Sequence, residues 1–410
     1  MNKSDIVPLS TLNGVLLGFT SIIGSGLFFL PVLVANLSPD TPILPWLILG
    51  IGCVPFIYVF SKISIDLSSG EGVIGIVRKT LGIEWARYAT AILITGTSFG
   101  IPLAAVVAGT YVSTLFPNSS EITNVAAAII LCAAWLQNIF GFQLALLIQR
   151  LLVCITTIAL LFFAFDVGGL TPEIKLPSWN NLVSSAALAP MIFWAFAGWE
   201  NLSFLSNRFA NPEKQVPFVM MTTLIMSCLV YIAFTLIAVF YMPASESLQS
   251  SPLTFGDMVS AGLLSVSSNT LILLVVIACL LIWANSAAWI LGLSSLFGAM
   301  TLENSVTSSQ FRRLLVLGGG YICGYAVIVF FPNTIPFIVS AVSAAFLTIY
   351  ALVLISFGKI AKSPQDRIVG IASGIVLLGG IIFMGHALIP QFILSVLFLS
   401  PWLYKRFSRY

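Results

Sequence analysis

Charged residues are scarce in this sequence. Asp, Glu, Lys and Arg make up 8% of its 410 residues, whereas 59% are hydrophobic. This composition excludes a soluble enzyme with a single membrane anchor and is typical of an integral membrane protein. The longest stretches without a membrane-spanning candidate, near residues 62–84, 166–184 and 243–268, are too short to form a hydrophobic core of their own. We therefore expect one all-α transmembrane domain over residues 1–410.

Residues for acid–base, metal or redox chemistry are also scarce. The sequence has one histidine, His386, no His-Glu-x-x-His motif and no pair of acids inside an apolar run, so it lacks the usual groups of an enzyme active site. All six cysteines fall inside apolar runs without the spacing of zinc ligands, which predicts free, packed thiols. The chain is not expected to be an enzyme or to bind a metal or a cofactor.

Long apolar runs account for most of the chain. Runs of about 20 apolar residues, the length that spans a bilayer, predict twelve transmembrane helices near residues 10–35, 42–62, 85–115, 122–140, 143–166, 184–206, 216–242, 268–300, 313–331, 334–358, 367–386 and 388–404. Alternate loops then place sixteen of the seventeen Lys and Arg residues on one side and only Lys175 on the other. The positive-inside rule predicts that both termini are cytoplasmic, in the cell inner (plasma) membrane. The net charge of +3 reflects this topology and does not indicate nucleic-acid binding.

The first apolar run contains Gly24, Ser25 and Gly26 near its middle. Hydrocarbon offers no hydrogen-bond partners, and this tripeptide is a weak point in a helix. A break there would leave free N–H groups from Ser25 to Leu27 and free C=O groups from Ser21 to Ile23. Such amides suit a carboxylate, and such carbonyls suit an ammonium group. Alternatively, the small residues form a close-packing face of an unbroken helix.

The sixth run contains a second weak point. Pro190 loosens the helix early, Ala197 and Gly198 interrupt it at mid-depth, and Glu200 follows at once. The two breaks thus occur in the first and the sixth predicted span.

The positions of the two breaks predict an internal repeat. Five crossings reverse the orientation of the next unit, so residues 184–358 are expected to be an inverted copy of residues 10–166, with two added helices at residues 367–404. The interrupted helices are then the first of each copy. That arrangement indicates a substrate site at the membrane midplane of a secondary transporter.

Glu200 is the one acid deep inside an apolar run, since the other thirteen lie in loops or at span ends. A charged carboxylate there costs several kcal/mol, so Glu200 should face a cavity or be neutral. Two interpretations stay open: Glu200 couples proton movement to substrate movement, or it is permanently protonated and caps the broken helix. Trp194 also has two interpretations, a lid over bound substrate or an ordinary interhelical aromatic.

Three motifs in the sequence resemble those of the amino acid-polyamine-organocation (APC) transporters. They are Ile-Ile-Gly-Ser-Gly-Leu-Phe at residues 22–28, Phe-Trp-Ala-Phe-Ala-Gly-Trp-Glu at residues 193–200 and Asn-Pro-Glu-Lys-x-x-Pro at residues 211–217. The likeness covers essentially the whole chain. Within the family, the compact length and the second motif are most similar to bacterial exporters of L-methionine and branched-chain amino acids.

The resemblance implies a LeuT-type fold, with a five-plus-five inverted repeat and two added C-terminal helices. It also implies a substrate site at the two breaks, where Gly24 and Gly198 interrupt the helices. In that site the substrate carboxylate is held by the amides of Ser25, Gly26 and Leu27, and its ammonium group by the carbonyls of Ile22, Trp194, Ala195 and Ala197. Trp194 falls where family members place an aromatic gate, and Glu200 where several proton-coupled members place an acid.

The chain departs from the family pattern in three places. Residues 154–157 read Cys-Ile-Thr-Thr where many members have a Lys that replaces a sodium ion, Arg208 replaces an acid, and residues 293–295 read Leu-Ser-Ser where an Arg is common. These changes leave the coupling ion and the cytoplasmic gate open.

The predicted function is secondary active transport of neutral, apolar amino acids (methionine, leucine, isoleucine and valine) by proton-coupled export. Glu200 is the one buried formal charge, so a charged substrate side chain would lack an obvious partner. The alternatives are proton-driven uptake or exchange of other amino acids, amines or polyamines and, outside this class, a channel or sensor. The expected partners are the amino acid, protons and the lipid bilayer, without nucleic acid; a homodimer stays open.

Overall fold

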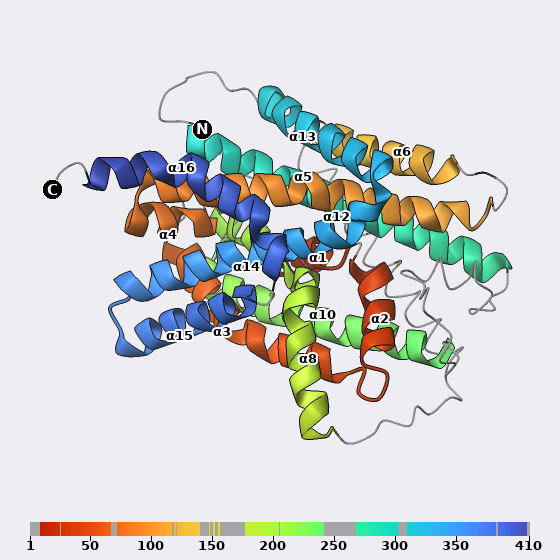
Figure 1. Cartoon of the computed structure of the whole chain (residues 1–410), viewed down its shortest axis with the longest axis horizontal. Coiled ribbons are helices and arrows are strands. Elements are labelled where there is room, and N and C mark those ends of the chain that lie inside the picture. Colours follow the sequence, from red (N-terminus) through yellow and green to blue (C-terminus); the bar gives the residue numbers. More distant parts are fainter. Residues whose placement is uncertain are drawn as a thin grey trace.

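In the computed structural model the chain is all-helical (Figure 1). The structure describes residues 9–24, 26–66, 72–116, 119, 121–139, 147, 151, 155, 177–204, 206–241, 268–301, 310–382 and 384–407. Among these residues, 7 helices are long and apolar enough to cross a membrane: Leu44–Asp66, Ile83–Ser113, Pro212–Val239, Leu271–Phe297, Phe311–Phe330, Pro332–Ile360 and Pro364–Ile382. The chain is therefore a multi-pass membrane protein.

The helices follow the predicted apolar runs closely. In chain order they are α1 (Thr11–Ile22), α2 (Gly26–Leu37), α3 (Leu44–Asp66), α4 (Gly72–Leu81), α5 (Ile83–Ser113), α6 (Ile122–Gln137), α8 (Trp179–Ile192), α9 (Trp199–Phe204), α10 (Pro212–Tyr241), α12 (Ser268–Thr301), α13 (Gln310–Phe330), α14 (Ile335–Ile360), α15 (Pro364–Ile382) and α16 (Ile389–Phe407). Short 3-10 turns are η2 (Phe193–Phe196), η3 (Ser206–Arg208), η4 (Pro332–Thr334) and η5 (Gly385–Leu388). The predicted span at residues 143–166 lies almost entirely outside the described residues, so the count of twelve spans stays a prediction.

The long helix α5 lies at the centre of the bundle. It packs against α4, α6, α12, α13, α14 and α16, while α3 pairs with α10, and α14 with α15. Most of these helices run along the long axis of the molecule, but α2 and α8 cross that direction (Figure 1). The two crossing helices are those next to the predicted breaks, so the breaks change the direction of the chain.

Local capping and one backbone bridge fix the segments around the breaks. The Ser10 hydroxyl accepts from the Asn13 N–H at 3.2 Å and begins α1, as expected of an N-cap serine. Directly before it, Leu9 forms a parallel bridge with Phe209, and the Leu9 N–H donates to the Arg208 carbonyl at 2.8 Å. The start of α1 is thereby tied to the segment that follows α9.

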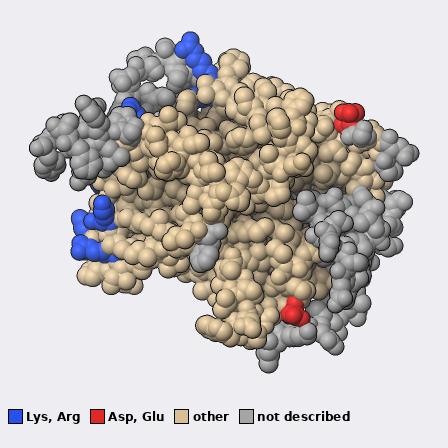
Figure 2. All heavy atoms as spheres, viewed as in Figure 1, with Lys and Arg blue, Asp and Glu red and all other residues tan. Residues whose placement is uncertain are grey.

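Charges separate along the long axis. The visible Lys and Arg side chains lie on the left of the view, where α14 joins α15 and near the start of α13, and the visible Asp and Glu side chains lie toward the opposite end (Figure 2). At the basic end, the Lys62 Nζ of α3 contacts both carboxylate oxygens of Asp366 in α15, at 2.7 and 2.8 Å. On this face of the molecule, basic and acidic side chains thus lie toward opposite ends of the bundle.

Candidate functional site

The first predicted helix break is present. Helix α1 ends at Ile22, the Ile23 backbone is extended, and α2 begins at Gly26. The Ile23 N–H closes α1 by donating to the Phe19 carbonyl at 2.7 Å. The unbroken helix with a small-residue face, the alternative interpretation, is therefore wrong.

One backbone N–H group at the start of α2 already donates a hydrogen bond within the break. The Leu27 N–H donates to the Gly24 carbonyl at 3.1 Å, so this predicted carboxylate ligand already has a partner within the turn. The amides of Ser25 and Gly26 are the other two predicted carboxylate ligands, and Ser25 lies outside the described residues.

The second predicted break is also present. Helix α8 tightens into the 3-10 turn η2, Ala197 is extended, and Gly198 has φ +140° before α9 begins. That φ lies in the left-handed half of the map, which residues with a Cβ rarely adopt. The glycine therefore allows the chain to turn between η2 and α9.

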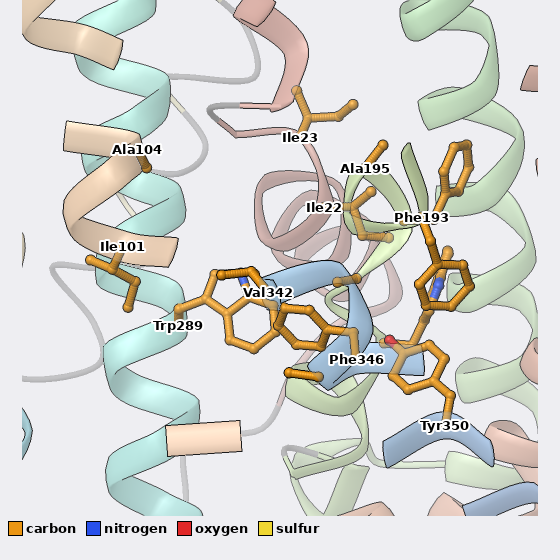
Figure 3. Close-up of a cluster of buried hydrophobic side chains, with 14 of the residues drawn as sticks. Ile22, Ile23, Ile101, Ala104, Phe193, Ala195, Trp289, Val342, Phe346 and Tyr350 are labelled. Carbon is orange, nitrogen blue, oxygen red and sulfur yellow. The ribbon is translucent and has the colours of Figure 1, made fainter. Parts of the chain in front are cut away.

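The two breaks touch each other through their glycines. A Cβ on Gly198 would lie 2.8 Å from the Ser21 carbonyl oxygen and 3.0 Å from Ile22 Cγ1, and one on Gly26 would lie 3.8 Å from Ala195 Cα. Figure 3 shows Ile22 of α1 beside Ala195 of η2. The missing side chains thus allow two interrupted backbones to meet inside the protein.

The last carbonyls of α1 receive donors from other helices. Asn285 Nδ2 of α12 donates to the Thr20 and Ser21 carbonyls at 2.8 and 2.9 Å. The indole N–H of Trp289, one turn further along α12, donates to the Ser21 carbonyl at 3.1 Å. The Tyr231 hydroxyl of α10 lies 3.5 Å from the Ile22 carbonyl. The predicted acceptors at the end of α1 are therefore in hydrogen-bond contact with neutral donors.

Glu200 lies in the first turn of α9 and is fully buried. Its Oε2 accepts from the Gly198 N–H at 3.2 Å and from the Tyr350 hydroxyl of α14. The rings that contact Tyr350 are those of Phe56, Phe60 and Phe193, and Figure 3 shows Phe193 beside Tyr350. Glu200 thus caps the start of α9 and contacts α14 through one carboxyl oxygen, an arrangement that is compatible with both interpretations made from the sequence.

Two small cavities lie at the breaks. The first, of about 10 Å³, has room for about one water molecule and is lined by Ser21, Ile22, Gly24, Gly26, Trp194, Ala197, Tyr231, Asn285 and Trp289. The second, of about 20 Å³, is lined by Gly96, Thr97, Gly100, Ile101, Ala104, Trp194, Asn285, Trp289, Val342 and Phe346. Glu200 lines neither of them, so of the two expectations for Glu200, that it faces a cavity or is neutral, these two cavities do not provide the first.

Trp194 is half-buried and lines both cavities. Its ring centroid lies 5.9 Å from that of Phe29 in α2, and a Cβ on Gly100 would lie 3.7 Å from its Cζ2. On the other wall, the Trp289 ring lies 5.3 Å from Phe346 (Figure 3). Two tryptophans on different helices therefore border the narrow space between α5 and α14.

The structure brings together most of the predicted site residues. Ile22, Gly24, Gly26, Trp194 and Ala197 line the first cavity. Three others are buried around it without lining it: Leu27, Ala195 and Gly198. The carbonyl of Trp194, a predicted ammonium ligand, accepts from the Ala197 N–H at 3.1 Å.

Sequence reasoning missed four residues that hydrogen-bond at the breaks: Tyr231, Asn285, Trp289 and Tyr350. Asn285 had a usable signal, because an amide side chain within the apolar run of α12 needs a partner. Trp289 then lies on the same face, one turn away. The two tyrosines had no such signal in a chain with 10 tyrosines and 31 phenylalanines. Within the described part of the chain, no group of His, Cys, Asp or Glu has the arrangement of a metal site.

Comparison with solved structures shows the fold. The chain superimposes on the crystal structure of MhsT in complex with L-phenylalanine with a TM-score of 0.65, over 93% of this chain and 99% of that one, at 12% sequence identity. At that identity the likeness concerns the LeuT-type architecture alone.

Curated relatives share about a quarter of the aligned residues. The L-methionine/branched-chain amino acid exporter YjeH of Escherichia coli is 24% identical over 59% of this chain and 59% of its own length. The methylthioribose transporter of Bacillus subtilis is 24% identical over 65% of this chain and 63% of its own length. The putrescine transporter PotE of Haemophilus influenzae is 24% identical over 62% of this chain and 59% of its own length. This chain thus spans about three-fifths of the length of these relatives.

The family assignment rests on a match along nearly the whole chain. The family model described as amino acid permease matches residues 9–404, which include both breaks and all the helices that border the cavities. The family and the relatives are permeases and transporters, in agreement with the expectation that the chain is not an enzyme. The chain belongs to the amino acid permease family of the APC superfamily.

Proposed function

We propose that the chain is a secondary active transporter of neutral, apolar amino acids that exports methionine, leucine, isoleucine and valine in exchange for protons. The observation that carries the proposal is the meeting of two helix breaks inside the bundle, where the backbone of Ser21 contacts Gly198. Half-helix ends that meet at a buried cavity offer the polar backbone groups that an amino acid needs at both of its charged ends.

The lining of the second cavity supports an apolar substrate side chain. Its walls contain Ile101, Ala104, Val342 and Phe346, and neither cavity is lined by a charged side chain. A third cavity of about 200 Å³ shares Gly96 and Val342 with the second. An apolar pocket separates one such side chain from another by only ~1–3 kcal/mol, so methionine and the branched-chain amino acids are expected to compete.

Transport requires the site to open, because the cavities of about 10 and 20 Å³ are too small for an amino acid. Trp194 lines both of them, so rotation of its side chain would join them into one space. We assign Trp194 the role of a lid over the bound substrate. Movement of one helix repeat against the other would then expose the site to each side of the membrane in turn.

Proton coupling is assigned to Glu200. Its fully buried carboxyl group hydrogen-bonds to Tyr350 of α14 and to the Gly198 N–H at the second break. A change in its protonation therefore changes the contact between α9 and α14 next to the substrate cavity. Charging a buried carboxylate is unfavourable unless its partners compensate, which links the proton to the conformation of this contact.

Amine transport is the weaker candidate. A relative transports putrescine, but a diamine needs an acidic partner, and Glu200 lines neither cavity at the breaks.

The remaining architecture is proposed with the function: twelve spans, inverted repeats at residues 10–166 and 184–358, and both termini on the cytoplasmic side of the inner membrane. The basic end of the bundle (Figure 2) supports that orientation.

The first test compares bacteria with and without the expressed chain, fed dipeptides that contain methionine, leucine, isoleucine or valine. Intracellular pools of these amino acids should fall and their efflux should rise when the chain is present. Unchanged pools with a well-expressed, membrane-inserted chain would overturn the export proposal.

The coupling residue is tested in proteoliposomes with Glu200→Gln. This variant keeps a hydrogen-bonding side chain but cannot release a proton, so net transport driven by a pH gradient should be lost while exchange of labelled for unlabelled leucine continues. Glu84→Gln is the matched control, because Glu84 is a surface acid 3.3 Å from Arg87. Net proton-driven transport by Glu200→Gln at the wild-type rate would remove Glu200 from the coupling.

A further inference from the structure

We propose that the side-chain amide of Asn285 takes the place of a cation at the C-terminal end of α1, so that this chain needs no metal cation at the first break. The inference rests on the proposed transport function for its biological meaning, although its test includes a measurement without substrate. Asn285 is thereby a positioning residue that holds the broken end of α1 against α12.

The physical need for a positive partner arises from the helix end itself. The last four carbonyls of a helix have no intrahelical donor, and the aligned peptide dipoles give that end about half a negative charge. In broken membrane helices such carbonyls are sites for cations. In this chain the positive partners are the N–H groups of two neutral side chains.

The hydrogen bonds determine the orientation of the Asn285 amide. Its nitrogen lies 2.8 Å from the Thr20 oxygen and 2.9 Å from the Ser21 oxygen. Carbonyl oxygens only accept, so the NH₂ group of the amide must face α1. The Trp289 indole adds a third donor at 3.1 Å from the Ser21 oxygen. Two adjacent carbonyls are thus bound as a cation would bind them, but without a net charge.

The amide also fills the space at the break. A Cβ on Gly24 would overlap the Asn285 amide, and one on Gly198 would lie 2.8 Å from the Ser21 oxygen. The adjoining cavity of about 10 Å³ contains no acidic side chain in its lining. A metal ion at these carbonyls would therefore have to displace the amide and would find no acidic side chain in the lining of this cavity.

Asn285→Asp tests the inference, because it exchanges the donor amide for a carboxylate that repels the α1 carbonyls. A bound Na⁺ would bridge the carboxylate and the carbonyls, so the variant should become sodium-dependent. Ser286→Ala is the matched control, since Ser286 is the next residue of α12, is buried, and its hydroxyl has no hydrogen-bond partner in the described part of the chain.

The purified full-length protein is heated in detergent with NaCl or with choline chloride at equal ionic strength. The melting temperatures of the wild type and of Ser286→Ala should not depend on Na⁺, whereas that of Asn285→Asp should be higher in NaCl. Leucine exchange in proteoliposomes should follow the same pattern. In the Asp variant the exchange rate should be about tenfold or more higher in NaCl than in choline chloride, and a tenfold change corresponds to about 1.4 kcal/mol at 25 °C.

A wild type that is stabilised by Na⁺, or a folded Asp variant that does not respond to it, would overturn the inference. Should Asn285→Asp fold in neither salt, Asn285→Ala is heated instead. It removes the N–H donors from the Thr20 and Ser21 carbonyls, so it should melt below Ser286→Ala, and equal melting temperatures of the two variants would also overturn the inference. A sodium response of the expected pattern without any leucine exchange would leave the inference standing and overturn the proposed transport.

Discussion

The two helix breaks leave different backbone groups without a partner in the helix, and different side chains bind these groups. The first leaves carbonyls at the end of α1, which Asn285 and Trp289 of another helix satisfy with neutral N–H donors. The second leaves the Gly198 N–H at the start of α9, which Glu200 satisfies from its own helix. A helix end that needs donors receives amide and indole groups, and a helix start that needs an acceptor receives a carboxyl group.

This difference separates two functions. Neither an asparagine amide nor an indole gains or loses a proton in the physiological range, so the first break keeps the same charge throughout the cycle. The second break contains a titratable group that touches α14 through Tyr350. We therefore propose that the first break mainly recognises the substrate and that the second couples proton movement to transport.

The largest effect is expected from Gly198→Ala, which damages both breaks at once. A Cβ at φ +140° is strained and would lie 2.8 Å from the Ser21 oxygen, which together destabilise the protein by roughly 2–4 kcal/mol. The melting temperature and the yield of monodisperse protein measure the loss. Gly319→Ala is the control, because a Cβ there has nothing within 4 Å; equal losses in both variants would contradict the proposed contact between the breaks.

Tyr350→Phe should weaken coupling at the second break alone. The ring stays packed against Phe56, Phe60 and Phe193, but Glu200 loses its hydroxyl donor. Hydrogen bonds to charged groups contribute about 1.5–3 kcal/mol, so proton-driven net transport should fall at least tenfold in proteoliposomes while leucine exchange is largely retained. Tyr88→Phe, which removes a hydroxyl 3.3 Å from the Gln391 carbonyl, should change neither rate.

Trp289→Phe should affect the first break alone. The ring contact with Phe346 can persist, but the donor 3.1 Å from the Ser21 carbonyl is lost. A neutral hydrogen bond contributes about 1 kcal/mol, so the apparent leucine affinity in exchange assays should change by about fivefold, with the same ratio of net transport to exchange. A selective loss of proton-driven transport would show that the first break also takes part in proton coupling, contrary to the proposed roles of the two breaks.

The smallest effect is expected at the basic end, away from both breaks. Asp366→Asn removes the partner of Lys62, whose side chain is 41% exposed. A solvent-accessible ion pair stabilises by about 1 kcal/mol or less, so the melting temperature should fall slightly. Transport by the folded protein, and its ratio of net transport to exchange, should remain at wild-type values.

The breaks could be predicted from sequence, but the side chains that complete them could not. Gly24 and Gly198 are weak points of apolar runs, and Glu200 is an acid deep inside one. Each glycine alone also suits a close-packing face of an unbroken helix, but their places in the first and the sixth predicted span favour two breaks. Asn285 and Thr20 are 265 residues apart, and Tyr350 and Glu200 are 150 apart. Such contacts depend on how α12 and α14 pack against the breaks, which periodicity does not determine.

The position of Glu200 illustrates the same limit. Its depth in an apolar run predicts burial, and the structure agrees. Sequence reasoning expects it to face a cavity or to be neutral, but does not predict that Tyr350 and the Gly198 N–H hydrogen-bond to its carboxyl group. A partner hydroxyl on a distant helix can replace water, and no local pattern identifies that hydroxyl.

Binding of leucine and its analogues to the purified protein tests the central claim most directly, since the two breaks are argued to bind both charged ends of an amino acid. Leucine should raise the melting temperature progressively as its concentration exceeds its dissociation constant, whereas leucinamide, which lacks the carboxylate, and 4-methylpentanoate, which lacks the ammonium group, should have much smaller effects at the same concentrations. Equal stabilisation by all three compounds, or none by leucine, would contradict an amino-acid site built from the two broken helices.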